Sequence, residues 1–305
     1  MPRIFVTGPA SWNLLVHVAE LPPAEPQTVF ARWHHETLGG TSAGKALNLR
    51  RLGASVTLCT LLGDDAAGDR IRQVLTAAGV DLLARRSGNG SERHVNLMDP
   101  AGRRLSVYLT LPAIDPAGPD DDIGERCAAA LATADAVVVD LAEHSRPVLA
   151  AARARGRTVW CDLHNYDGRS AFHAEFRDAA DMLFVSDERL PDPEAFLHDQ
   201  IDRGKRVVVC TRGADGAIGL ESGGELVRVP AEPVPEVVDT NGAGDAFFAG
   251  FLTAHLAGRA LPDCLRNGAS VAAECVRSPD LAGRDAPRVS SAPSQVHGNI
   301  RTGDS

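Results

Sequence analysis

A turn of small residues opens a long apolar helix pattern in the stretch VDTNGAGDAF, which spans residues 238–247. Apolar side chains after this turn recur at helical spacing, which predicts a helix over residues 245–257 that faces the core. Small residues let backbone N–H groups approach an anion, and the helix dipole adds positive potential at the same end. The stretch therefore indicates an anion-binding turn at the start of a buried helix.

Asp245 places a negative charge at the helix start where an anion would bind. This carboxylate is suited to take a proton from an attacking hydroxyl, while the amides of residues 242–244 stabilise charge on a transferring phosphoryl group. A helix N-cap after a glycine turn is the simpler explanation for an aspartate in this position. The spacing alone leaves both interpretations open.

The rest of the chain alternates short β-branched runs with longer helix patterns. Strands are expected at residues 4–7, 56–61, 136–141, 158–162, 182–185 and 207–211. Helices are expected at residues 43–52, 66–78, 122–133, 146–155, 192–203, 245–257 and 263–276. Strands that are apolar throughout suit a parallel sheet that is covered on both faces. This alternation predicts βαβ units and a doubly wound three-layer sandwich.

Two segments interrupt the alternation, at about residues 11–37 and 90–111. The first has period-two spacing, a proline-rich turn and a second expected strand at residues 29–33. The second has a hairpin pattern around a turn at residues 99–102. Extra strands inserted into a sandwich predict a small β-sheet lid, with an ordinary extension of the sheet edge as the alternative. The polar segment 286–305 is expected to be a loose tail.

Composition limits the kind of ligand. The 305 residues include 40 acidic and 31 basic side chains, with a net charge of −9, 44% hydrophobic residues and 23% charged residues. These values are typical of a globular protein and exclude wholesale disorder. Nucleic acid is not expected as a partner because its phosphates require clustered Lys and Arg. A membrane is not expected either, because no run reaches the roughly 18 apolar residues that span a bilayer.

The cysteines and the first residues predict the compartment. The six cysteines, at positions 59, 127, 161, 210, 264 and 275, show neither a CxxC motif nor metal-site spacing. Most lie in apolar runs, so we expect reduced core residues. Residues 1–7 have the pattern of a strand and not of a signal peptide. A cytoplasmic location is therefore expected.

Three motifs together resemble those of the ribokinase-like carbohydrate kinases, the PfkB family. DTNGAGD at 239–245 is similar to the carboxy-terminal signature of that family. Gly39-Gly40, followed by LG at 52–53 and LGDD at 62–65, resembles its amino-terminal signature. CTRGADG at 210–216 is similar to its nucleotide-phosphate strand and turn. The order and separations also agree, so the resemblance covers roughly residues 3–280.

The resemblance implies a fold and a reaction. The fold would be a ribokinase-like three-layer sandwich over residues 1–285, with a mainly parallel doubly wound sheet and a small inserted β-sheet lid. The reaction would be ATP-dependent transfer of the γ-phosphoryl group to a hydroxymethyl group of a sugar or related polyol. The lid would close over this small-molecule substrate and exclude water. A homodimer formed through the lid is a further implication.

The resemblance also assigns roles to individual residues. Asp245 would be the catalytic base, and the amides of Gly242, Ala243 and Gly244 would form the anion hole. The residues assigned to ATP are Thr211, Gly213 and Gly216 along its phosphates or ribose and Asn267 near the adenine. The residues assigned to the substrate are Asn13, Gly39 and Gly40. Mg²⁺ would accompany ATP, held mostly by phosphates and water, and a monovalent cation such as K⁺ would have Asp239 and Thr240 as ligands.

Three positions depart from the family pattern. Asn13 stands where an aspartate usually binds sugar hydroxyls, and Gly44 stands where an asparagine usually follows the paired glycines. The family's Asn-x-x-Glu element would fall on SDER at 186–189, where neither end fits, although Asp187 or Glu188 offers a partial substitute. These departures keep two alternatives open. One is a nucleoside or sugar-phosphate kinase of the same fold, and the other is a nucleotide- or metabolite-binding protein with weak or no kinase activity.

Lys45 supports two interpretations. GGTSAGKA at 39–46 nearly spells a Walker A loop, but Ala46 lacks the hydroxyl that would bind magnesium. Three-residue spacing puts Lys45 on one helix face with Asn48 and Arg51, which favours a solvated position. The sharper hypothesis is that Lys45 binds a phosphate or carboxylate of the substrate. Asp162, at the carboxyl end of a strand, is expected either to line the substrate cleft or to cap the next turn.

Overall fold

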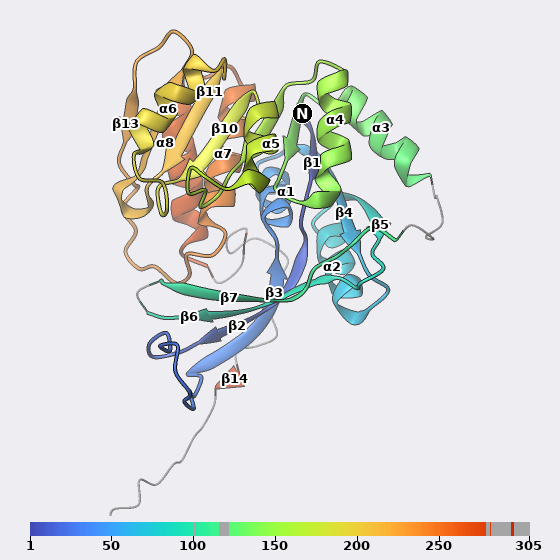
Figure 1. Ribbon diagram of the computed structural model, residues 1–305, viewed down its shortest axis with the longest axis vertical. Helices are drawn as coiled ribbons and strands as arrows, with labels where there is room; N and C mark the ends of the chain where they lie inside the picture. Colours follow the sequence, from blue (N-terminus) through green and yellow to red (C-terminus); the bar gives the residue numbers. More distant parts are fainter. Residues whose placement is uncertain (101, 116–121, 279–280, 282–293, 296–305) are drawn as a thin grey trace, which may run out of the picture.

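Two sheets of different size organise the chain (Figure 1). The computed structural model describes residues 1–100, 102–115, 122–278, 281 and 294–295. Within these residues, sheet A has nine strands and sheet B has five. Sheet B lies in the lower part of the view in Figure 1, where α2 contacts its strands β2 and β3. Across the described ranges, no helix is both long and apolar enough to cross a bilayer.

Sheet A has the strand order β13-β12-β11-β10-β9-β8-β1-β4-β5. Its strands are β1 (Arg3–Thr7), β4 (Ser55–Leu62), β5 (Asp81–Arg86), β8 (Ala136–Val139), β9 (Val159–Asp162), β10 (Met182–Ser186), β11 (Val207–Thr211), β12 (Ala217–Glu221) and β13 (Val227–Val229). The pairs from β5 to β11 are parallel, and β12 and β13 add antiparallel strands at one edge. The carboxyl ends of seven strands therefore meet at one edge of the sheet.

Four helices cover each face of sheet A. One face carries α1 (Thr41–Arg51), α2 (Ala66–Ala77), α7 (Ala243–Leu256) and α8 (Leu261–Cys275). The other carries α3 (Ile123–Thr133), α4 (Arg146–Ala154), α5 (Ala171–Ala179) and α6 (Pro193–Asp202). Strand side chains alternate between the two cores, as Ile4 and Val6 join the first and Phe5 joins the second. The predicted three-layer sandwich with a mainly parallel sheet is confirmed.

Helix α7 is positioned by close packing against α8. A Cβ at Gly250 would lie 2.8 Å from the carbonyl oxygen of Asn267, and one at Gly268 would lie 2.9 Å from that of Phe247. The two backbones approach this closely because both glycines lack a side chain. The start of α7 is thereby fixed relative to the carboxyl edge of sheet A.

Sheet B is the small second sheet, with the order β14-β3-β2-β6-β7. Its strands are β2 (Ser11–His17), β3 (Trp33–Gly39), β6 (Glu92–Met98), β7 (Arg104–Thr110) and β14 (Ser294–Gln295). β2 pairs with β6 in parallel, and the other pairs are antiparallel. β1 is followed by β2 after residues 8–10, and β3 runs into α1 through Gly40 alone.

The expected strand at residues 29–33 is wrong in its placement. The structure has no strand in residues 18–32, and β3 begins at Trp33. Val29 and Phe30 are 41% and 60% exposed, so their β propensity is not supported by burial. β5 and α5 were not predicted. Ser294–Gln295 pair with β3, and the rest of the expected tail at 286–305 lies outside the described residues.

Candidate active site

Three carboxylates meet at the carboxyl edge of sheet A. Asp140 directly follows β8, Asp162 is the last residue of β9, and Asp245 lies in the first turn of α7. The first two are neighbours because β8 and β9 are parallel and adjacent. Open α/β sheets place their ligands at this edge. The site therefore brings together residues more than 100 positions apart.

Lys45 of α1 lies at the centre of these carboxylates. Its Nζ is 2.8 Å from Asp245 Oδ1, 3.1 Å from Asp140 Oδ1 and 3.3 Å from Asp162 Oδ2. The side chains of Lys45 and Asp140 are fully buried, whereas Asp162 and Asp245 are each 10% exposed. We call these four residues the Lys45 cluster. Solvent therefore reaches the Lys45 cluster only at Asp162 and Asp245.

The solvated position expected for Lys45 is therefore wrong. Residues 42–49 of α1 are all buried, because the helix packs against both sheet A and α7. The spacing argument assumed one solvent-facing side, which α1 does not have over these residues. In the structure the Lys45 ammonium contacts carboxylates of the protein itself.

Burial and neighbouring positive charge have opposite effects on the pKa of these carboxylates. Burial raises the pKa of Asp245 to about 6, against the lowering effect of the Lys45 ammonium. Burial also favours the neutral form of Asp162, but His164 and Lys45 outweigh it and hold the pKa of that carboxyl below its usual range. Asp245 is consequently the member of this pair that can exchange a proton near neutral pH.

The start of α7 has the geometry of an anion site. Gly242 is the N-cap and has a φ of 81°, and no side chain caps the helix. Asp245 is thus not an N-cap, which removes the simpler of its two interpretations. A Cβ at Gly44 would lie 2.6 Å from Asp245 Oδ2, so the glycine that replaces the family's asparagine leaves room for this carboxylate.

The residues assigned to ATP lie near the carboxyl end of β11 and on α8. Thr211 ends β11, and Gly213 begins the short 3₁₀ helix η2 (Gly213–Asp215). Gly216 has a φ of 86°, and a Cβ there would lie 2.1 Å from the carbonyl oxygen of Val229, so this turn requires glycine. Asn267 donates from Nδ2 to the carbonyl oxygen of Gly250 at 2.7 Å and so links α8 to α7.

Asp239 is the residue whose contacts fit a cation. Its Oδ1 accepts a hydrogen bond from the Asn241 backbone at 2.8 Å, but its buried Oδ2 has no partner. Burial raises the pKa of this carboxyl. The neighbouring Thr240 is exposed. Among the described residues, no group of three or more His, Cys, Asp or Glu side chains could hold a metal ion.

Asn13, Gly39 and Gly40 lie where sheet B joins the body. Asn13 is on β2, and a Cβ at Gly39 would lie 1.9 Å from its Nδ2. The Asn13 Oδ1 is buried without a hydrogen-bond partner, so one acceptor is left for a ligand. Gly40 has a φ of 90°, and a Cβ there would lie 2.5 Å from the Pro9 carbonyl oxygen. Sheet B also reaches the signature turn, since Arg104 donates to Asn241 Oδ1 at 3.1 Å.

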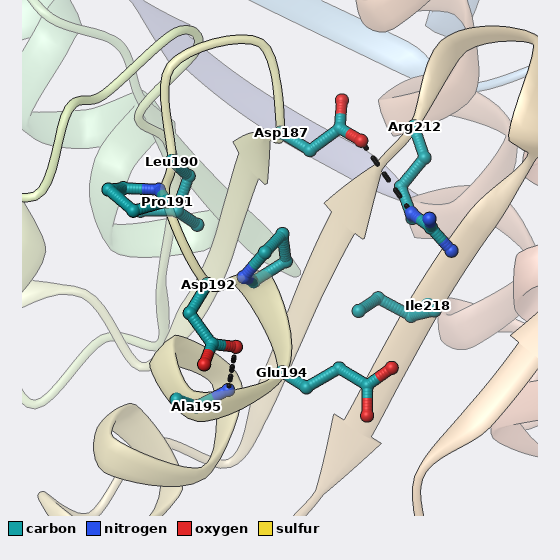
Figure 2. A pocket seen from close by; sticks show the side chains of 9 residues that line it. Asp187, Leu190, Pro191, Asp192, Glu194, Ala195, Arg212 and Ile218 are labelled. Atoms are coloured by element: carbon teal, nitrogen blue, oxygen red, sulfur yellow. Dashed lines mark hydrogen bonds and ion pairs between the residues drawn. The ribbon is translucent and has the colours of Figure 1, made fainter.

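Asp187 is the residue of the SDER segment at 186–189 that lines a separate pocket of about 490 Å³ (Figure 2). Asp187 points toward Arg212 across it, with 3.6 Å between Oδ2 and Nε. Asp192 and Glu194 add acidic side chains to the lining. None of the Lys45 cluster lines this pocket.

Two residues of the site were missed by sequence reasoning. Asp140 was taken as part of an apolar strand, yet a carboxylate at the end of such a strand is itself a signal for a ligand edge. Ser42 donates from Oγ to Asp140 Oδ2 at 2.7 Å. Asp162 caps the turn after β9, because its Oδ1 accepts from the His164 backbone at 2.9 Å, and its Oδ2 lies 3.3 Å from Lys45 Nζ.

Known proteins of one family resemble this chain over most of its length. The model of the pfkB family carbohydrate kinases matches residues 1–287. Acarbose 7(IV)-phosphotransferase of Actinoplanes sp. is 38% identical over 270 residues, which cover 87% of this chain and 89% of that protein. ATP-dependent ribose-1-phosphate kinase of Halopiger xanaduensis is 33% identical over 268 residues, which cover 84% and 86% of the two chains.

Solved structures show the same fold. The microbiome-derived acarbose kinase Mak1 has a TM-score of 0.76 at 30% identity, over 91% of this chain and 93% of that chain. Ribokinase of Arabidopsis thaliana, complexed with ribose and ATP, has a TM-score of 0.74 at 23% identity, over 92% and 94% of the two chains.

Fold and relatives together define a phosphotransferase that acts on an alcohol group. The chain belongs to the pfkB family of carbohydrate kinases. The predicted family, the ribokinase-like fold and the prediction of an ATP-dependent sugar kinase are thereby confirmed.

Proposed function

We propose that this kinase transfers the γ-phosphoryl group of ATP to a hydroxymethyl group of a carbohydrate, with Asp245 as the base. One observation carries the proposal. A carboxylate that is only 10% exposed lies in the first turn of α7, directly after the glycine-rich turn at 242–244. A pure anion site has no use for that negative charge, whereas phosphoryl transfer to a hydroxyl needs a proton acceptor there.

The chemistry follows from two neighbouring groups. With a pKa of about 6, Asp245 is mostly ionised at neutral pH and accepts the proton of the attacking hydroxyl. The backbone amides of Gly242, Ala243 and Gly244 stabilise the charge on the transferring phosphoryl group, supported by the dipole of α7. Both groups are preorganised, because α7 is held against α8 by close packing.

ATP occupies the region of Thr211, Gly213 and Gly216, with its adenine toward Asn267. The support is their motif and their place near the carboxyl end of β11. Mg²⁺ is held by the phosphates and water, as a hard cation prefers, and Asp187 or Glu188 supplies a nearby carboxylate. When bound, Mg²⁺ neutralises phosphate charge during transfer.

A monovalent cation such as K⁺ binds at Asp239 and Thr240. The unpartnered, buried Oδ2 of Asp239 supports this assignment, since a buried carboxylate oxygen without a partner is costly. The cation satisfies that oxygen and stabilises the turn that leads to the anion hole.

The substrate is bound between the body and sheet B, which acts as the lid. Asn13, Gly39 and Gly40 line its inner end, and the free Asn13 Oδ1 accepts from a sugar hydroxyl. Two relatives are named for acarbose, so acarbose and other oligosaccharides are the first substrates to test. A sugar phosphate is the second candidate, because another relative is named a ribose-1-phosphate kinase.

Location and assembly follow the same reasoning. The six free cysteines, five of them buried, fit the reducing cytoplasm, where ATP is available.

The edge strand β7 exposes Leu105, Val107 and Leu109, and an exposed apolar edge strand favours pairing with a second copy. The proposed assembly is therefore a homodimer through the lid.

ATP turnover against a panel of acarbose, monosaccharides, sugar phosphates and nucleosides tests the proposed function. We expect turnover with at least one carbohydrate and a loss of about 10²–10⁴-fold in Asp245→Asn, which removes the base. Asp192→Asn is the matched control, because asparagine caps α6 as well as aspartate does. Tight ATP binding without turnover on any compound would instead identify a nucleotide-binding protein.

A further inference from the structure

The charges of the Lys45 cluster are unequal. Three carboxylates surround one ammonium, and all three lie within 3.3 Å of its Nζ. Below Nζ lies the ring of Phe248, with its centroid at 5.2 Å. The Lys45 ammonium is thus the one cation inside this group of four, and its loss would leave three buried carboxylates facing one another.

The two oxygens of Asp245 have different surroundings. Oδ1 is held by Lys45 Nζ at 2.8 Å. Oδ2 faces Gly44, where a Cβ would lie 2.6 Å away. The adjacent residues Gly44 and Lys45 therefore act on the same carboxylate. Lys45 holds Oδ1, and Gly44 leaves space beside Oδ2.

We propose that Lys45 is the positioning residue of the catalytic base: its ammonium keeps Asp245 ionised and fixes Oδ1, so that Oδ2 accepts the proton of the substrate hydroxyl. This inference rests on the proposed function of Asp245 and deepens it. It replaces a substrate contact for Lys45 with a contact to the base itself.

Among the described residues, the charged and titratable groups that interact with Asp245 set this balance. Lys45 and His164 favour its ionised form, whereas Asp140 opposes it. Asp162 carries its own counter-charges, Lys45 and His164. Cys275 of α8 also faces the cluster, and burial raises the pKa of its thiol to about 12, so it stays neutral. Lys45 is the closest of the groups that favour ionisation.

The proton balance of the step is simple. The hydroxyl O–H bond breaks, and its proton goes to Asp245 Oδ2. The hydroxyl oxygen forms a bond to the γ-phosphorus, the bond from that phosphorus to the bridging oxygen of ATP breaks, and ADP leaves with that electron pair. Lys45 keeps its proton throughout, because its three carboxylates raise the pKa of the ammonium well above the usual value despite its burial.

The test is the pH profile of kcat/KM, which reports the base in the free enzyme. In Lys45→Met we expect the acid limb to move up by about 1–3 pH units, as for a carboxylate that loses an adjacent cation. This shift lowers kcat/KM at pH 7 by about twofold for one unit, about tenfold for two and about 90-fold for three, with recovery at alkaline pH. In Asp140→Asn the limb moves to lower pH, because a neighbouring negative charge is removed.

Lys205→Met is the matched control. Lys205 is also a buried lysine, but its Nζ donates to the backbone carbonyls of Asp178 and Ala180. Its loss lowers stability without moving the acid limb. A purely structural role for Lys45 would lower kcat/KM equally at every pH. An unmoved limb in Lys45→Met, or a raised sugar KM with an unmoved limb, overturns the inference.

Two further measurements keep the inference testable. If Lys45→Met does not fold, the pH profile of Asp140→Asn provides the test. An acid limb that does not move to lower pH in Asp140→Asn would overturn the proposed charge balance. If the wild type shows no turnover, the proposed function fails, and ¹³C NMR titration of the Asp245 carboxyl then decides separately, with Asp245→Asn for its assignment. An equal Asp245 pKa in the wild type and Lys45→Met would overturn the role of Lys45.

Discussion

Gly44 controls the space beside Asp245, the proposed base. A methyl group there would lie 2.6 Å from Asp245 Oδ2, so Gly44→Ala is expected to displace the carboxylate and lower kcat by about 10²-fold, as for a misplaced catalytic group. Gly124→Ala is the control, because that helical glycine has open space where a Cβ would be added. Steady-state kinetics with melting temperatures checks this expectation, and a Gly44→Ala enzyme with unchanged kcat would contradict it.

The wild-type pH profile follows from Asp245 alone. Its pKa lies at about 6, above the usual value for aspartate, because burial disfavours the charge. The base form is therefore present above pH 6 and is lost as the pH falls through that value. We expect kcat/KM to decrease tenfold per pH unit below about pH 6. A profile that stays flat down to pH 5 would show that Asp245 is not the base.

At this scale the sequence predicted Asp245 but not its partners. Asp245 was found because it belongs to a short, continuous motif. Lys45 was placed in solvent because helical periodicity assumes one exposed side, and α1 is enclosed on both. Asp140 was missed because its role depends on how neighbouring strands pair, which local patterns do not contain.

The first turn of α7 depends on one left-handed residue. Gly242 has a φ of 81°, and Gly242→Ala is expected to lower the free energy of unfolding by about 1–2 kcal/mol. A Cβ would also lie 2.9 Å from Leu281 Cδ2, so the anion hole shifts and kcat falls. Chemical denaturation and kinetics measure both effects.

Gly258→Ala separates strain from function. Gly258 follows α7 with a φ of 73° and has open space around its Cβ position. The substitution has a similar conformational cost but lies beyond the other end of the helix. The role of Gly242 is supported if both variants are equally destabilised but only Gly258→Ala keeps full activity. The same kcat in both variants would refute it.

At the scale of elements, most of sheet A could be predicted. Continuous apolar runs such as AVVV at 136–139 are buried on both faces, so composition and structure coincide. The position of β3 could not be predicted, because residues such as His35 and Thr37 are polar and yet buried. Hydrophobic periodicity and β propensity are properties of a segment's own sequence, whereas its burial depends on the other elements that pack against it.

The contact between lid and body is a property of the whole molecule. Arg104 of β7 donates to Asn241, beside the proposed anion hole. This contact is exposed, so Arg104→Ala is expected to change stability by less than about 1 kcal/mol but to raise the sugar KM several-fold, because the lid closes less tightly.

Arg228→Ala is the control for this substitution. Arg228 also forms an exposed ion pair, with Glu194, but belongs to sheet A. Initial rates over a range of sugar concentrations distinguish the two variants. The same sugar KM in Arg104→Ala and the wild type would mean that the Arg104 contact does not contribute to closure.

Two of the chain crossings between the body and sheet B, residues 8–10 and Gly40, lie close together. Gly40 lies so near Pro9 and Ala10 that a Cβ there would be 2.5–2.7 Å from their backbone atoms. The chain also passes between the two sheets at residues 87–91 and after β7, so this is one of several connections. Gly40 is the single residue between β3 and the helix that carries Lys45. Because a single residue joins β3 to α1, a displacement of β3 is passed to the first turn of α1, four residues before Lys45. Closure of sheet B over a sugar would then also shift Lys45 relative to Asp245, and a spin-label distance between sheet B and α1 would follow this movement.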